Sequence, residues 1–158
     1  MVEFDEFYML AAIKEANKAF AKDEIPVGGV AVSDGKIITR GHNLRERKNN
    51  PISHCEMLLI EKAAKKLKNW RLNDITIYVT LEPCIMCIGA MLQARVKRLV
   101  YGADDFKGGA VKSLYRLAAD KRLNHQIEVT SGVLADKCGE ILSAFFKKLR
   151  EKTSEPLR

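Results

Sequence analysis

Two short groups of residues in this chain carry side chains that together could hold a metal ion. His54 is followed two positions later by Glu56, and Pro83 precedes Cys84 and Cys87. One imidazole and two thiolates are ligands that zinc prefers, and a tetrahedral zinc ion takes four. A site with three protein ligands keeps one position for water, which is typical of catalytic rather than structural zinc. We therefore predict a catalytic zinc site with His54, Cys84 and Cys87 as its ligands.

Glu56 is the expected proton carrier of this site. Zinc lowers the pKa of its water toward about 7, and a carboxylate nearby can accept a proton and later donate it. Residues two apart on a regular helix point roughly 200° apart. His54 and Glu56 can therefore face one metal only if His54 lies at the irregular first turn of a helix. Cys84 and Cys87 share a helix face and the first turn, where the helix dipole favours thiolates.

The cysteines also have other interpretations. Cys-x-x-Cys is typical of thioredoxin-like redox proteins, but there it follows the first strand of the fold, which is not the case here. A structural zinc site would need Cys55 or Cys138 as a fourth ligand. We expect Cys55 to pack beside the metal, since adjacent helical residues rarely bind one ion. Cys138 is expected to be a buried core thiol, because it falls on an apolar stripe with Leu142, Phe145 and Leu149.

The pattern of apolar residues predicts the elements that position these groups. In the first helix, Met9, Ile13, Ala16 and Phe20 recur at helical spacing. We expect helices over residues 4–22, 54–67, 84–93, 113–119 and 136–152, and strands over 27–32, 36–41, 75–81, 96–101 and 126–130. Helices that alternate with strands predict an α/β fold, a three-layer α/β/α sandwich around a mixed sheet of about five strands. We expect residues 1–158 to form a single domain.

The charge of the chain indicates the kind of partner. Its 27 Lys and Arg residues against 20 Asp and Glu residues give a net charge of +7, which favours a polyanion such as RNA. The strongest basic patch is expected on the last helix, at Lys147, Lys148, Arg150 and Lys152. No apolar run is long enough to cross a bilayer, so we expect no membrane partner. The acidic first residues are unlike a secretory signal, and we expect a cytoplasmic protein.

Several motifs, some around the zinc group and others outside it, are shared with a known family. They are residues 50–56, 78–87 and 102–110, Pro26-Val27-Gly28, Gly41-His42-Asn43, Leu123-Asn124-His125 and Phe145-Phe146. With these motifs nearly the whole chain resembles bacterial tRNA-specific adenosine deaminases, of the cytidine deaminase superfamily. The His-x-Glu and Pro-Cys-x-x-Cys pattern is shared by zinc-dependent nucleobase deaminases. The Asp105 loop and Asn124 point more narrowly to the tRNA branch. Cys55 stands where the family usually has alanine, and we expect little effect on the chemistry.

The resemblance implies a fold, a reaction and partners. The fold would be cytidine deaminase-like, and the reaction hydrolytic deamination of adenosine to inosine at the wobble position of a tRNA anticodon loop. Each subunit of a homodimer would hold one Zn²⁺, and the substrate would be the anticodon stem-loop. Asn43, at a strand end, has an amide suited to a purine edge. By resemblance, Asp105 and Asn124 would contact nucleotides and Lys107 would contact phosphates. From spacing alone, each of the three fits an ordinary solvated loop residue as well as it fits an RNA contact.

Two other functions remain open at this point. One is a zinc-dependent deaminase of a free base or nucleoside, of the guanine or cytosine type, which shares the zinc motif but does not need a basic last helix. The other is a non-catalytic zinc module that binds RNA.

Overall fold

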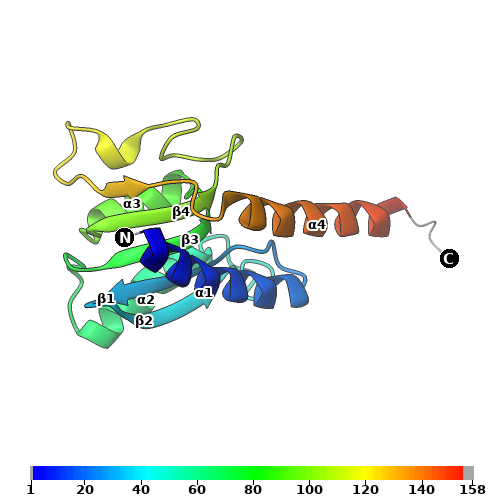
Figure 1. The fold of residues 1–158 in the computed structure, drawn as a ribbon, viewed down its shortest axis with the longest axis horizontal. Helices are drawn as coiled ribbons and strands as arrows, with labels where there is room; N and C mark the ends of the chain where they lie inside the picture. The colour runs from blue at the N-terminus through cyan, green and yellow to red at the C-terminus, as the bar shows by residue number, and fades with distance from the viewer. Residues whose placement is uncertain (1, 155–158) are drawn as a thin grey trace.

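The computed structural model describes residues 2–154, in which a mixed sheet of five strands lies between two layers of helices (Figure 1). The elements in chain order are α1 (Val2–Ala21), β1 (Gly28–Ser33), β2 (Lys36–His42), α2 (Cys55–Leu67), β3 (Thr76–Leu81), α3 (Ile85–Gln93), β4 (Arg98–Ala103), the short 3₁₀ helix η1 (Leu117–Ala119), β5 (Glu128–Thr130) and α4 (Ala135–Ser154). The predicted α/β sandwich with five strands is confirmed.

The sheet has the strand order β2-β1-β3-β4-β5. β1 pairs antiparallel with β2 and β3, whereas β3, β4 and β5 are parallel. As a result the start of β1 and the ends of β2, β3 and β4 lie at the same edge of the sheet. The helices α2 and α3 also begin at this edge, because each follows a strand that ends there. Every residue that immediately follows β2, β3 or β4 is therefore brought to one place.

The alternation of side chains along the strands divides the core into two layers. Ile77 and Val79 of β3 pack in the larger cluster with α2 and α3, whereas Tyr78 between them packs in the cluster of α1 and α4. The same alternation separates Leu99 from Val100 in β4. In Figure 1, α4 runs from the sheet past its edge, with α1 beside it. Cys138 of α4 is fully buried in the second cluster, as predicted.

Close packing of α1 on β1 requires a glycine. A Cβ atom at Gly28 would overlap the backbone of Ala12 and Ala16 in the helix. Only a residue without a side chain permits this approach.

One predicted element is wrong. Residues 113–119 do not form a regular helix, and only Leu117–Ala119 are helical, as η1. The N–H and hydroxyl of Ser113 donate instead to Glu82, and the N–H of Leu114 donates to the carbonyl of Gly109. These bonds direct the backbone away from helical pairing. Among the described residues, no helix combines the length and apolar character that crossing a bilayer requires.

Candidate active site

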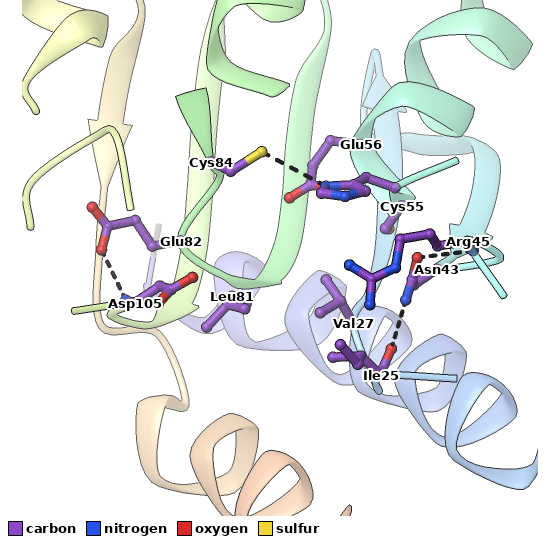
Figure 2. A pocket seen from close by; sticks show the side chains of 11 residues that line it. Ile25, Val27, Asn43, Arg45, Cys55, Glu56, Leu81, Glu82, Cys84 and Asp105 are labelled. Carbon is purple, nitrogen blue, oxygen red and sulfur yellow. Dashed lines mark hydrogen bonds between the residues drawn. The ribbon is translucent and has the colours of Figure 1, made fainter. Parts of the chain in front are cut away.

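A pocket of about 160 Å³ opens at the sheet edge where the strand ends converge. Its volume is below the 300–1,000 Å³ range of drug-sized ligand sites, so it suits a small planar group better than a large ligand. Its walls come from the segments before β1, after β2 and β3, and after β4, and from the starts of α2 and α3 (Figure 2). The lining residues are Ile25, Val27, Asn43, Arg45, His54, Cys55, Glu56, Leu81, Glu82, Cys84 and Asp105.

The structure brings the three predicted zinc ligands together. His54 Nδ1 lies 3.6 Å from the sulfur of Cys84 and 3.6 Å from that of Cys87. Ligands at about 2.0 Å and 2.3 Å from one tetrahedral zinc ion are separated by about 3.6 Å, so the donor set fits that metal. Within the described part of the chain, this is the one cluster of three or more histidine, cysteine or acidic residues with such spacing.

Local backbone geometry explains this convergence. His54 is the N-cap of α2, with the extended backbone angles φ −71° and ψ 154°, and Glu56 lies in the first turn. The side chains of His54 and Glu56 are therefore not bound by regular helical spacing, and both line the pocket. Cys84 is likewise the N-cap of α3, and not inside the helix as predicted, while Cys87 lies one turn further on.

Glu56 is buried and next to the three donors. Its side chain is only 4% exposed, and Oε2 accepts a hydrogen bond from the Cys87 thiol at 3.4 Å. Burial raises the pKa of the Glu56 carboxyl, whereas the histidine nearby opposes the rise. Hydrogen bonds from Cys87 and His54 lower the pKa of Cys84 to about 4, which favours the thiolate. The hydrogen bond to Cys84 raises the pKa of His54.

Comparison with known proteins identifies the family. The sequence model of the MafB19-like deaminase family matches residues 4–150. A tRNA-specific adenosine deaminase of Bacillus subtilis (strain 168) is 55% identical over 148 residues, which are 94% of this chain and 92% of that protein. One of Haemophilus influenzae is 50% identical over 151 residues, 95% of this chain and 87% of that protein. The chain belongs to the tRNA-specific adenosine deaminase family.

Solved structures agree with this assignment. One, from a study of A-to-I editing by tRNA:A34 deaminases at the wobble position of transfer RNA, is 41% identical and superimposes with a TM-score of 0.83. The alignment covers 86% of this chain and 99% of the chain in that structure. A guanine deaminase from Nitrosomonas europaea has a TM-score of 0.78 at 22% identity, with 89% and 83% coverage, and shares the fold. This deaminase therefore has the cytidine deaminase-like fold that the resemblance implied.

The structure places the other predicted site residues of the deaminase differently. Asn43 and Asp105 line the pocket, from opposite walls. Lys107 is exposed and lies in a neighbouring groove rather than in the pocket. Asn124 is exposed and precedes β5, which pairs in parallel with β4 from Arg98↔Glu128 onward. It therefore lies near the starts of these strands, whereas the pocket follows their ends. Within one chain Asn124 is not brought to the pocket.

A buried carboxylate holds the wall that carries Asp105. Glu82 is 2% exposed, and its oxygens accept hydrogen bonds from the backbone N–H groups of four residues and from the Ser113 hydroxyl at 2.5 Å. The four residues are Asp105, Val111, Lys112 and Ser113. Burial alone would raise the pKa of Glu82, but these hydrogen bonds lower it below its ordinary value. A Cβ atom at Gly109 would overlap the Glu82 carboxylate, so this loop must carry a glycine there.

A second buried carboxylate holds the opposite wall. Glu24, just after α1, is 0% exposed and accepts from the backbone N–H groups of Glu46 at 3.1 Å and Arg47 at 2.6 Å. The Asn43 amide group also donates to it, at 3.5 Å. Sequence reasoning missed both Glu24 and the pocket residue Arg45. The position of Arg45, two residues after Asn43 in the same loop, was the signal that could have found the arginine.

The pocket continues into a wider groove between the Asp105 loop and α4. The groove has a volume of about 760 Å³ and shares Ile25, Leu81 and Asp105 with the pocket. Its other lining residues are Asp104, Phe106, Lys107, Leu142, Ser143, Phe146 and Arg150. The groove, which leads directly to the candidate active site, is thus bordered by two exposed aromatic rings and two cations. These are Phe106, Phe146, Lys107 and Arg150.

Proposed function

We propose that this chain converts adenosine to inosine by hydrolysis at the wobble position of a tRNA anticodon loop. The observation that carries the proposal is the convergence of His54 Nδ1 and the sulfurs of Cys84 and Cys87 beside the buried carboxylate of Glu56, in a pocket of base size. The family membership supports adenosine in tRNA as the substrate, since the relatives at 50% and 55% identity are tRNA-specific adenosine deaminases.

One Zn²⁺ per chain fits the donor set of His54, Cys84 and Cys87. When bound with an open fourth position, zinc supplies a Lewis acid that makes water nucleophilic near neutral pH. The extended N-cap geometry of His54 directs Nδ1 toward the two sulfurs. The start of α3 favours Cys84 as a thiolate, because its N–H groups and dipole favour negative charge, whereas the hydrogen bond to Cys84 and burial raise the pKa of Cys87.

Glu56 moves the protons of the reaction. Its carboxylate accepts a proton from water as the water oxygen adds to C6 of adenine, and a proton passes to N1. Having given the water proton to N1, Glu56 takes the remaining proton of the hydroxyl added at C6 and gives it to the departing amine, so that one water is consumed, one ammonia leaves and C6 becomes a carbonyl. The burial that raises the pKa of Glu56 suits this role, because it makes the protonated form accessible between the two transfers.

RNA contacts are proposed on both sides of the pocket. Asn43 reads the purine edge and Asp105 contacts the target nucleotide, while Lys107 and Arg150 face the phosphates of bases that enter the groove. Phe146, 40% exposed, offers a ring on which an unpaired base can stack. In the basic patch of α4, Lys148 and Lys152 lie 3.6 Å and 3.7 Å from Asp23, so part of their charge is already balanced.

The same proposal extends to the location, the domain organisation and the oligomeric state of the protein. We place the protein in the cytoplasm, where tRNA is modified in bacteria, and treat residues 1–158 as one deaminase domain. We also propose a homodimer. The position of Asn124, far along the sheet from the pocket of its own chain, is consistent with a role at a second subunit's site.

The test is an inosine assay on the purified, zinc-loaded protein. An anticodon stem-loop RNA with adenosine at the wobble position should be deaminated, whereas free guanine and cytosine should not. Replacement E56Q should abolish turnover while the zinc content stays at one per chain. Activity confined to free bases would instead assign the protein to the base deaminases, and full turnover by E56Q would remove the proposed proton carrier.

A further inference from the structure

Arg45 has a position that the proposed chemistry does not yet use. It is the one lysine or arginine among the described residues that line the pocket. In Figure 2 its side chain extends from the wall of Asn43 over the pocket, on the side opposite Asp105. The side chain is 42% exposed, whereas Glu56 is 4% exposed. The guanidinium therefore lies toward the mouth of the pocket and the proton carrier at its floor.

The charge of Arg45 is weakly balanced within the protein. The guanidinium contacts the carboxylate of Glu46 at 3.4 Å, and the Glu46 side chain is 68% exposed. An ion pair between two solvated side chains contributes little. The acidic groups of the pocket have other partners: Glu82 holds the Asp105 loop, and Asp105 Oδ1 accepts from the N–H groups of Lys107 and Gly108. The guanidinium thus retains donors for a ligand.

The backbone that carries Arg45 is held from several directions. Its N–H donates to Asn43 Oδ1 at 3.2 Å, and its carbonyl accepts from the N–H of Asn50 at 3.0 Å. The next two residues donate their N–H groups to the fully buried Glu24. A cationic side chain on a fixed base loses less freedom when it binds, because its starting point is already set.

We propose that Arg45 binds the phosphodiester attached to the target nucleotide and so makes the pocket prefer a nucleotide within a chain to a free base or nucleoside. This inference rests on the proposed function. With the reacting base at the floor beside Glu56, the ribose and its phosphates must lie at the mouth, where the guanidinium is. A guanidinium offers a planar fork of donors that matches two phosphate oxygens, and Lys107 and Arg150 lie in the groove beyond.

The experiment compares R45Q with R47Q on two kinds of stem-loop RNA. Arg47 is a matched control, because it lies in the same loop, is exposed and does not line the pocket. One RNA is unmodified; in the others a neutral methylphosphonate replaces the phosphate on the 5′ or the 3′ side of the target adenosine. On unmodified RNA, R45Q should lower kcat/KM by about 10- to 100-fold, mainly through KM, and R47Q by less than about threefold.

The modified RNAs separate a phosphate contact from any other role. If Arg45 binds one of these phosphates, R45Q and the wild-type protein should deaminate the corresponding methylphosphonate RNA equally well. R45K should recover part of the loss on unmodified RNA, since lysine keeps the charge but not the fork. A loss by R45Q that is the same on all the RNAs, or no greater than that of R47Q, would overturn the proposal. Inosine formation by the wild-type protein tests the proposed function separately.

Discussion

The two walls of the pocket are built in the same way but differ in what they are connected to. Each is a loop whose backbone N–H groups converge on one buried carboxylate, Glu82 for the Asp105 wall and Glu24 for the Arg45 wall. Glu82 stands two residues before the candidate ligand Cys84, whereas Glu24 follows α1 and lies 30 positions before the candidate ligand His54.

Additional hydrogen bonds join the Asp105 wall to the residues around Cys84. The N–H of Ala110 donates to the carbonyl of Pro83 at 2.9 Å, and Cys84 forms an isolated β-bridge with Gly109. The Asp105 wall is therefore bonded directly to a candidate ligand, while the Arg45 wall reaches the site through the bond from the N–H of Leu44 to the carbonyl of Ser53 at 3.1 Å, one residue before His54. Metal retention and substrate recognition should therefore be easier to separate on the Arg45 side of the pocket than on the Asp105 side.

The largest effect is expected for E82A. Alanine would leave four backbone N–H groups without their acceptor, and each such loss costs about 1–3 kcal/mol, so unfolding free energy should fall by about 5 kcal/mol. Zinc content should fall as well, because the loop is joined to Pro83 and Cys84. Chemical denaturation and metal analysis measure the two effects. An E82A protein that keeps its full zinc content would contradict this connection between the wall and the metal site.

A substitution at the other end of the sheet gives a reference for effects on stability alone. Arg98 donates to Asp5 at 2.9 Å and 2.7 Å, and Tyr78 donates at 2.8 Å. D5N should cost about 3 kcal/mol at neutral pH, because it leaves Arg98 without its main partner. Zinc content and KM should not change.

The pH dependence of this loss has a defined sign. Burial raises the pKa of Asp5, but the hydrogen bonds from Arg98 and Tyr78 lower it more, so the folded pKa lies below the ordinary value of 3.8. The stabilisation is complete above that value and is lost as pH falls through the folded pKa. Urea unfolding of the wild-type protein and D5N should differ equally at pH 7 and pH 5, and the difference should shrink as pH falls below 3.8. A difference that stays constant from pH 5 down to pH 2 would contradict the ion-pair explanation.

A smaller effect on stability, but a specific effect on recognition, is expected for E24A. Two backbone N–H groups lose their acceptor, which should cost about 2 kcal/mol. The loop with Asn43 and Arg45 should loosen, so that KM for the stem-loop rises about tenfold while zinc content stays at one per chain. Steady-state kinetics and metal analysis on the same preparation measure KM and zinc content. Loss of zinc in E24A would show that the two walls are not independent.

The smallest effect is expected for S113A. This change removes one hydroxyl donor from Glu82 and leaves the four backbone donors in place, so the cost should be about 1 kcal/mol. Zinc content and KM should remain those of the wild-type protein. A loss as large as that of E82A would mean that the hydroxyl, rather than the backbone, holds the wall.

The elements and the donor cluster could be predicted because their signals are local. Apolar periodicity places the helices and strands within a few residues, and His54, Cys84 and Cys87 are chemically distinctive residue types. The requirement that His54 lie at an irregular first turn is met by its N-cap conformation.

The walls of the pocket could not be predicted, because their contacts join distant parts of the chain. Ser113 donates to a carboxylate 31 positions earlier, and this bond replaces the helix that periodicity predicts over 113–119. Glu24 acts on residues 22 and 23 positions later. No local pattern marks either carboxylate as buried, since acidic residues are usually exposed. Asn124 is predicted from its motif alone, and the parallel direction of β4 and β5 places it near their starts, at the opposite end of the sheet from the pocket of its own chain.

Gly28 limits which substitutions this sequence can accept. Because the backbone of α1 occupies the space of a side chain there, even one added methyl group would push the whole first helix outward. Glu24 follows that helix directly, so the displacement would travel to the loop that presents Asn43 and Arg45. A change at a residue that does not itself line the pocket would thereby reach the enzyme's choice of substrate.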